Sequence, residues 1–352
     1  MRFVHCGDLH LDTAFSGLCD GKTAAIRQAE LRRTFLSIIE LAKKADVLLI
    51  AGDLFDQESL EAETVHTLCR GFADLGDIPV LISAGNHDPL TAGSYYRLSA
   101  FPENVHVFDT SLEKIRVKDC DVYGISFGET VCDEALLKDC TFAGDVPSIL
   151  LMHGDLGGTA YNPIRKDWVS ASGLSYLALG HVHSYGEVRL GKTLCAYPGC
   201  PEGRGFDELD EKGVILGEVT KDGVKTEFVP VSLRRYREIH LDISGLLTHN
   251  AVIEKLSGMH LAPEDLYKVI LEGETDLVPD TTVLAEAFPG LFFVKFYDKT
   301  SRPLSMDIAD SAIRSLFAQK LSERASGEPI DLYDKALQLG LLALSGEKVK
   351  PL

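Results

Sequence analysis

The sequence has little that would place the protein in a membrane or outside the cell. Its 352 residues contain no uninterrupted apolar run that approaches the roughly 20 residues needed to cross a bilayer. The N-terminal segment MRFVHCGDLH lacks the charged start and long apolar stretch of a secretory signal. We therefore expect a cytoplasmic protein without membrane contact.

Cysteine pairs with the C-x-x-C spacing are also absent. The eight cysteines are scattered along the chain, and a disulfide framework is not expected in a chain of this length without a secretory signal. Structural zinc sites cluster their thiolates at short spacings, so a zinc–thiolate site is excluded as well. Cys6 and Cys195 lie in apolar runs and are predicted to behave as small buried hydrophobic residues.

Positive charge is scarce. The 35 lysine and arginine residues against 53 aspartate and glutamate residues give a formal net charge of −18. This balance argues against non-specific nucleic-acid binding, which relies on a basic surface. It does not exclude an enzyme that acts on nucleic acid, because bound cations add positive charge locally at a site.

The sequence does contain strand-like and helix-like segments that alternate along the chain, as in an α/β protein. Short apolar runs, which suit strands covered on both faces, are separated by segments with apolar residues at helical spacing. The main predicted strands are Phe3–Cys6, Val47–Ala51, Ile78–Ser83, Ile149–Met152 and Tyr176–Leu179. Helices are expected over 24–44 and 60–75, and further strands over 122–127, 186–190, 214–219 and 224–229.

The pattern divides the chain into three segments. Residues 1–232 form the first α/β domain. At 233–304 the alternation restarts as strand, helix, strand, helix, strand, which predicts a second, small α/β unit. Residues 305–352 are expected to be helical, with amphipathic stretches over 309–321 and 332–344.

The chemistry is indicated by a pattern that occurs five times, in which an apolar strand ends and metal-ligand residue types follow. In open α/β sheets, ligands bind beyond the carboxyl ends of the strands, so these side chains are expected to meet in one crevice. The residues concerned are Asp8, His10, Asp53, Asn86, His153, His181 and His183.

These ligand types favour a centre with two metal ions. Carboxylate, imidazole and amide oxygen suit Mn²⁺, Fe or Zn²⁺ better than Ca²⁺. A central carboxylate such as Asp53 is able to bridge two cations about 3.5–4 Å apart, and such a pair lowers the pKa of a shared water towards about 7. The resulting hydroxide is suited to attack on a phosphate ester.

One further pattern is rejected. Residues 186–193, GEVRLGKT, match the phosphate-loop pattern G-x-x-x-x-G-K-T. That loop needs a strand before it and a helix that begins at the lysine, whereas a β-prone run follows Lys192. We expect a hairpin turn at Gly191-Lys192 and no nucleotide binding there.

The motifs in order, D-x-H, G-D-x-F-D, G-N-H-D, H-G-D and G-H-V-H, resemble those of the calcineurin-like metallophosphoesterases. The opening Gly7-Asp8-Leu9-His10-Leu11-Asp12-Thr13 and the segment 196–206, AYPGCPEGRGF, are similar to the SbcD-type DNA-repair exonucleases, and most closely to their YhaO-like bacterial members. The resemblance covers residues 3 to about 214. It implies a four-layer αββα sandwich, in which residues 1–232 are the nuclease domain, followed by a cap domain and C-terminal helices.

The resemblance also implies a role for each residue. One metal would be held by Asp8, His10, Asp53 and His183, and the other by Asp53, Asn86, His153 and His181. His87 matches the family residue that stabilises the transition state or protonates the leaving oxygen, and Asp88 is expected to orient His87 or the local turn. Arg204 is expected either to contact a substrate phosphate or to stabilise its own loop. Archaeal and eukaryotic relatives carry a histidine where this sequence has Asp56, which weakens transfer of their detailed mechanism.

The function implied is a manganese-dependent phosphodiesterase acting on DNA, as an exonuclease or endonuclease. Two alternatives stay open: a phosphoesterase acting on a small phosphodiester, nucleotide or phosphoprotein, which the acidic charge favours, and a metal-binding component of a coiled-coil ATPase complex. The C-terminal helices are expected either to dock an SMC-like coiled-coil ATPase or to pack on the cap domain. The resemblance further suggests a homodimer.

Overall fold

The computed structural model describes residues 1–18, 21–56, 60–98, 100–133, 135–138, 140–142, 144–302, 312–324 and 330–344. The chain forms two compact units, which we describe separately. The first consists of Met1–Ile239, Leu261–Lys268 and Gly290–Val294, and the second of His240–His260, Val269–Pro289 and Lys295–Leu352. Among the described residues, no helix has both the length and the apolarity needed to cross a membrane.

The first unit contains two six-stranded sheets. The first sheet has the order β14 (Gly223–Pro230), β13 (Gly213–Thr220), β1 (Arg2–Cys6), β2 (Val47–Ile50), β3 (Val80–Ile82) and β4 (Val105–Val107). Strands β1 to β4 run parallel, with Phe3 opposite Val47, and β13 pairs antiparallel with β1. Parallel strands of this kind bring their carboxyl ends to one edge, which is the edge where the predicted ligands follow β1, β2 and β3.

Helices cover the outer face of this sheet. Helices α1 (Gly21–Ala42) and α2 (Ala62–Ala73) contact each other, with the rings of Phe35 and Phe72 5.4 Å apart between centroids. Phe35 and Ile39 of α1 and Phe72 of α2 pack in one buried cluster with Val4 and Ile50 of the sheet. This burial of apolar faces is what holds the helices on the sheet.

The second sheet has the order β11 (Gly186–Leu190), β12 (Thr193–Tyr197), β10 (Tyr176–Gly180), β7 (Ser148–His153), β6 (Cys120–Gly124) and β5 (Glu113–Val117). β7 and β10 are parallel, with Gly180 opposite His153. The short helix α4 (Lys166–Ala171) covers its outer face through Val169, which is buried with Leu150 and Leu177. Smaller elements are α3 (Tyr95–Leu98), β8 (Asp155–Leu156) and β9 (Pro163–Ile164).

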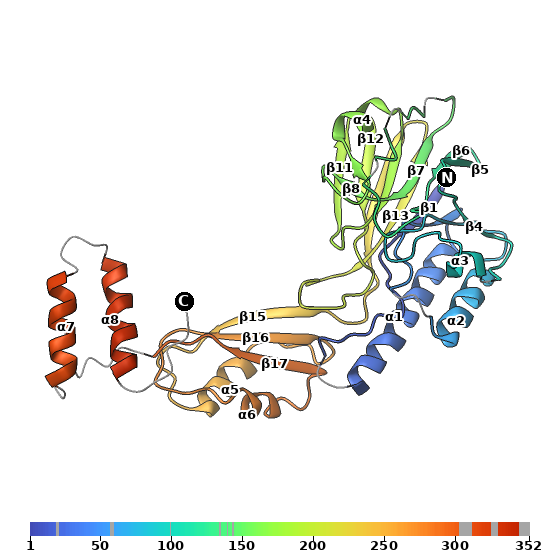
Figure 1. Ribbon diagram of the computed structural model, residues 1–352. Coiled ribbons are helices and arrows are strands. Elements are labelled where there is room, and N and C mark those ends of the chain that lie inside the picture. Colours follow the sequence, from blue (N-terminus) through green and yellow to red (C-terminus); the bar gives the residue numbers. More distant parts are fainter. Residues whose placement is uncertain are drawn as a thin grey trace. The chain divides into compact units, whose positions relative to one another are not determined.

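The two sheets pack face to face. Val47 and Leu49 from the first sheet share one buried cluster with Ile149, Leu151 and Ala178 from the second. Because alternate residues of a strand point to opposite faces, their neighbours Leu48 and Leu150 face the helices instead. The layers are therefore helix, sheet, sheet, helix (Figure 1), which confirms the predicted αββα sandwich.

The expected hairpin at Gly191-Lys192 is confirmed. β11 and β12 pair antiparallel, with Leu190 opposite Thr193, and Gly191 has a φ of 62°. A strand, rather than the helix that a phosphate loop requires, follows Lys192.

The C-terminal part of the chain contains a three-stranded sheet and four helices. The sheet has the order β15 (Tyr236–Asp242), β16 (Leu266–Glu272) and β17 (Phe293–Asp298). The helices are α5 (His249–Ser257), which is capped by the Thr248 side chain, α6 (Thr281–Glu286), α7 (Ala312–Arg324) and α8 (Ile330–Leu344). The remaining residues of the expected helical segment, 305–311, 325–329 and 345–352, lie outside the described part of the chain.

Candidate metal centre

All seven predicted ligand residues lie at or just beyond the carboxyl ends of central strands. Asp8 and His10 follow β1, and Asp53 follows β2. Asn86 follows β3, His153 is the last residue of β7, and His181 and His183 follow β10. The packed sheets therefore bring residues that are distant in sequence to one edge of the sandwich.

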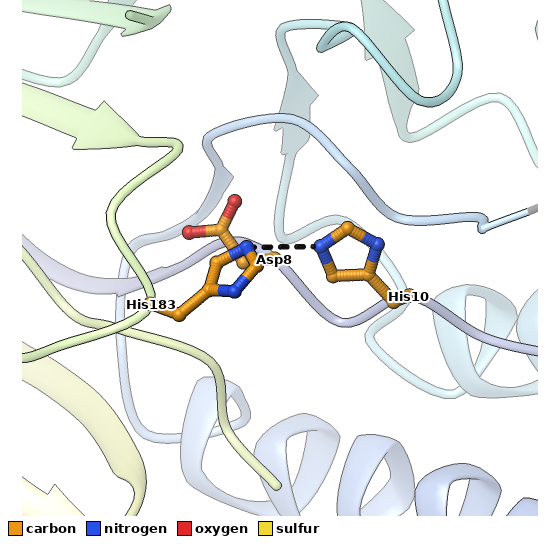
Figure 2. A group of neighbouring side chains, drawn as sticks. All are labelled: Asp8, His10 and His183. Carbon is orange, nitrogen blue, oxygen red and sulfur yellow. Dashed lines mark hydrogen bonds between the residues drawn. The ribbon is translucent and has the colours of Figure 1, made fainter. Parts of the chain in front are cut away.

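A first group contains Asp8, His10 and His183 (Figure 2). Their ligand atoms all lie within 4.8 Å of one another. Nε2 of His10 and Nε2 of His183 face each other at 3.2 Å. These atoms are close enough for all three side chains to share one cation.

A second group contains Asp53, Asn86 and His153. Nε2 of His153 lies 2.9 Å from Oδ1 of Asn86 and 3.4 Å from Oδ2 of Asp53. Nδ1 of His153 lies 2.9 Å from the carbonyl oxygen of Ala51, the acceptor that it would need in the tautomer whose Nε2 binds a cation. The His181 ring lies against the His153 ring, with 5.1 Å between centroids.

Asp53, a member of the second group, also lies beside His10 of the first group. Its Oδ2 atom is 3.4 Å from Nε2 of His153 and 3.7 Å from Nε2 of His10. The same side chain accepts a hydrogen bond at Oδ1 from the backbone N–H of His87. This is the position that a bridging carboxylate would occupy.

The backbone around the site is held in unusual conformations. Asp8, His10, Asp53 and His181 all have positive φ, at 52°, 46°, 49° and 103°. Non-glycine residues rarely adopt this region, and such strain concentrates at functional sites. Hydrogen bonds stabilise it, because the N–H groups of Asp8 and His10 donate to the carbonyls of Gly52 and Asp53.

The donor set fits divalent cations. The side chains of Asp8, His10 and His153 are fully buried and Asp53 is 1 % exposed, and buried carboxylates without compensating cations are costly. Burial lowers the pKa of His10 and His181, so both imidazoles are neutral, as metal ligands must be. Burial opposes ionisation of Asp53, whereas the hydrogen bond that it accepts from the backbone N–H of His87 acts to lower its pKa.

His87 lies at the rim of the site, with its side chain 44 % exposed. Its ring is 4.8 Å from the His10 ring, and its Nδ1 lies 3.2 Å from Oδ1 of Asp56. The hydrogen bond with Asp56 raises the pKa of His87 against the effect of burial. Asp56 also contacts Nδ1 of His10 at 3.0 Å, so one carboxylate holds both histidines.

Asp88 supports the turn rather than His87. Its carboxylate accepts hydrogen bonds from the backbone N–H groups of Gly85 and Leu54, both at 2.7 Å, and from the Tyr96 hydroxyl at 2.5 Å. The carboxylate that contacts His87 is Asp56 instead. Of the two roles expected for Asp88, the geometry favours the local turn.

Arg204 and a residue that the sequence did not single out, Glu208, lie beside His183. Nη2 of Arg204 is 2.7 Å from Oε1 of Glu208, and the same oxygen is 2.8 Å from Nδ1 of His183. Glu208 has no strand before it and lies 25 residues beyond His183. No spacing in the sequence therefore linked Glu208 to the site.

Comparison with known proteins agrees with this geometry. Residues 1–185, more than half of the chain, match the family model described as calcineurin-like phosphoesterase. The chain is 31 % identical over 249 residues to the uncharacterized metallophosphoesterase YhaO of Bacillus subtilis, covering 65 % of this chain and 60 % of that protein. It is 28 % identical over 278 residues to the DNA double-strand break repair protein Mre11 of Aeropyrum pernix, covering 71 % of this chain and 66 % of that protein.

A third relative is the SbcD component of the nuclease SbcCD of Bacillus subtilis, with 25 % identity over 252 residues, covering 59 % of this chain and 63 % of that protein. The matched region thus spans less than two thirds of the length of each of these three relatives. The matches confirm the resemblance that the motifs indicated: the chain belongs to the calcineurin-like phosphoesterase family.

Proposed function

We propose that the protein is a metal-dependent phosphodiesterase that hydrolyses DNA, as an exonuclease or endonuclease. The observation that carries the proposal is the position of Asp53, whose Oδ2 lies 3.7 Å from Nε2 of His10 and 3.4 Å from Nε2 of His153. A carboxylate between two groups of imidazoles and carboxylates suits two divalent cations a few ångströms apart. The choice of DNA is supported by relatives that are named as a nuclease and as a DNA repair protein.

In this proposal Asp8, His10, Asp53 and His183 hold one cation, and Asp53, Asn86, His153 and His181 hold the other. We propose Mn²⁺, with Fe and Zn²⁺ as alternatives that accept the same ligands. When bound, such a pair activates a water molecule at neutral pH and withdraws charge from the phosphate.

His87 supplies the proton in this proposal. Asp56 contacts its Nδ1 atom at 3.2 Å and raises its pKa, which favours the protonated imidazole. As the bond between phosphorus and the leaving oxygen breaks, His87 donates a proton to that oxygen. Asp53 fixes His87 from the other side by accepting its backbone N–H at 2.9 Å.

A smaller substrate is the second candidate. The net charge of −18 gives a long polyanion little general attraction to the surface. A small phosphodiester or nucleotide needs only the local charge of the cations. Phosphoprotein substrates belong to this second candidate as well.

The experiment that separates them is hydrolysis of bis-p-nitrophenyl phosphate beside single- and double-stranded DNA, across Mn²⁺, Mg²⁺ and salt series. DNA cleavage that depends on Mn²⁺ supports the first proposal. Hydrolysis of the chromogenic ester without DNA cleavage under any of these conditions favours the smaller substrate. Absence of both activities with either metal refutes the hydrolytic function.

We further propose that the protein binds an SMC-like coiled-coil ATPase through α7 and α8, and that it forms a homodimer. The support for the ATPase is a pair of C-terminal helices with exposed apolar side chains, among them Ile313, Leu316 and Leu332 at 65, 56 and 54 % exposure. The dimer rests on the family resemblance alone.

A further inference from the structure

The two imidazoles of the first proposed metal position are supported in the same way. Nδ1 of His10 lies 3.0 Å from Oδ1 of Asp56, and Nδ1 of His183 lies 2.8 Å from Oε1 of Glu208. When each Nδ1 atom donates its proton to the carboxylate beside it, both Nε2 atoms keep their lone pairs. Those are the atoms that face each other at 3.2 Å.

Arg204 connects the two supporting carboxylates. Its Nη2 atom lies 2.7 Å from Oε1 of Glu208, and its Nη1 atom lies 3.7 Å from Oδ1 of Asp56. Both carboxylates are thereby held next to one guanidinium group that cannot lose its charge under ordinary conditions. The guanidinium is shielded from solvent, with the side chain 17 % exposed.

Glu208 is itself fixed from several directions. Its second oxygen, Oε2, accepts the backbone N–H of Arg204 at 2.7 Å, and its side chain is 6 % exposed. Lys212 donates to the His183 carbonyl oxygen at 3.0 Å and so fixes the backbone of the same residue.

We propose that Glu208 is a positioning residue of the metal centre, which orients His183 and fixes its tautomer, and that Arg204 joins it to Asp56. The inference rests on the proposed function, because it assumes that His183 holds a cation. Partners of this kind orient a ligand ring and raise its basicity, and their loss typically costs about 10–100-fold in metal affinity. Arg204 then acts on the centre through the two carboxylates and through its own contact with His183, whose Nδ1 atom lies 3.0 Å from its Nη2 atom, rather than through the substrate.

The second proposed position provides an internal reference. His153 is oriented by the carbonyl oxygen of Ala51, which lies 2.9 Å from its Nδ1 atom. This carbonyl belongs to the backbone, so a substitution of Glu208 does not remove it. Loss of Glu208 should therefore weaken one position and leave the other unchanged. A purely structural role for Glu208 in its loop would instead lower the stability and weaken both positions together.

The test is calorimetric titration of the metal-free protein with Mn²⁺ alone, in the parent and in Glu208→Gln. Glutamine places an NH₂ group either at the oxygen that faces both His183 and the Arg204 guanidinium or at the oxygen that accepts the backbone N–H of Arg204, and an NH₂ group accepts no hydrogen bond at either place. We expect one of two sites to weaken by about 10–100-fold, the other to keep its affinity, and excess Mn²⁺ to restore hydrolysis of bis-p-nitrophenyl phosphate. Glu211→Gln, which changes a half-exposed carboxylate paired with Arg235, should alter neither site.

A second variant covers the case in which Glu208→Gln does not fold. Arg204→Gln removes the link between the carboxylates and is expected to weaken the same single site by about tenfold. Unchanged affinity of both sites in a folded variant, or equal loss at both, overturns the positioning role. If the unsubstituted protein binds no pair of Mn²⁺ ions, the proposed metal centre fails first, and the inference fails with it.

Discussion

At the scale of single residues, the neighbours of each histidine determine what it is able to do. Burial lowers the pKa of His10 and His181, which suits them as neutral ligands. The hydrogen bond that His87 donates to Asp56 raises the pKa of His87, which suits it as a proton donor. His183 differs from the other two ligands: burial acts to lower its pKa, but its hydrogen bond with Glu208 raises the pKa overall.

The role of His87 is tested by His87→Gln. We expect kcat on bis-p-nitrophenyl phosphate to fall by about 10²–10⁴-fold, the usual contribution of a positioned general acid. Metal content should be unchanged, because His87 is not among the proposed ligands. His87 does lie near enough to His10 and Asp53 to hold a cation with them, so a loss of one metal per chain would show that His87 is a ligand instead.

His5 gives a prediction about stability and pH. It is fully buried in β1 with Nδ1 2.9 Å from the Tyr176 hydroxyl, and burial lowers its pKa to about 3. The unfolded chain, with a histidine pKa near 6.5, binds the proton more readily than the folded chain. The contribution of His5 is therefore complete above pH 6.5 and is lost as the pH falls towards 3, by up to about 1.4 kcal/mol per pH unit.

Urea unfolding of the metal-free protein between pH 7.5 and about 4 measures this effect. In His5→Gln the free energy of unfolding should fall less steeply with decreasing pH than in the parent. His66→Gln, a change at an exposed histidine, should leave the parent slope intact. Equal slopes in the parent and in His5→Gln would contradict the assignment.

At the scale of elements, close backbone approach joins the two sheets at the ligand edge. A Cβ atom placed on Gly180, the last residue of β10, would lie 1.9 Å from the carbonyl oxygen of Ala51. Because Gly180 has no side chain, the end of β10 is able to lie against the segment after β2. It brings the backbone N–H of His181 to 2.9 Å from Oδ1 of Asp8.

Gly180→Ala tests whether this approach is required. We expect the free energy of unfolding to fall by about 1–3 kcal/mol, as for other overpacked sites, and Mn²⁺ affinity to fall because the ligands move apart. Gly186→Ala is the matched control, because a Cβ atom there meets nothing within 4 Å. Thermal unfolding and Mn²⁺ titration of both variants measure the two effects, and full Mn²⁺ affinity in Gly180→Ala would contradict the expectation.

Much of the fold was predictable because buried strands leave continuous apolar runs. The predicted strands Phe3–Cys6 and Tyr176–Leu179 correspond to β1 and β10, and the first strand expected in the segment 233–304 corresponds to β15, Tyr236–Asp242. The expected strand over 122–127 was displaced, since β6 covers Cys120–Gly124. Short strands such as β4 and β9 have too few residues to form a recognisable pattern.

The ligand residues were predictable because strand ends mark them, whereas their supporting residues were not. Asp56 was noted only as a difference from relatives, yet it contacts both His10 and His87. Glu208 follows an irregular segment, and only the folded chain brings it beside His183. Contacts of this kind depend on loop conformation, which no periodicity encodes.

At the scale of the whole molecule, the C-terminal helices form a pair of their own. A Cβ atom placed on Gly340 of α8 would lie 2.0 Å from the Cζ atom of Phe317 in α7. The Phe317 ring therefore occupies the space that any larger residue at position 340 would need. This close approach lets the helices pack on each other. Ile313 and Leu316, three residues apart on α7, stay 65 and 56 % exposed, which suits a surface that binds a partner helix.

Paired substitution of Ile313→Asp and Leu316→Asp tests this surface. We expect binding to the coiled-coil ATPase of the same organism to weaken by at least about tenfold, since two apolar contacts are replaced by charges. Phosphodiester hydrolysis and thermal stability should not change. Leu247→Asp, at a leucine that is 67 % exposed elsewhere in the second unit, is the control. Aggregation or a lower melting temperature of the paired variant alone would show that these residues pack within the protein.

The central claim is that seven side chains from distant parts of the chain hold two cations through a shared carboxylate. Elemental analysis of the Mn²⁺-loaded parent and of Asp53→Ala tests it most directly, with Asp210→Ala, at a carboxylate that is 77 % exposed, as the control. We predict about two metals per chain in the parent and the control, and reduced occupancy with loss of hydrolysis in Asp53→Ala, because one bridging carboxylate serves both ions. An Asp53→Ala protein that keeps two metals and its activity would contradict the claim.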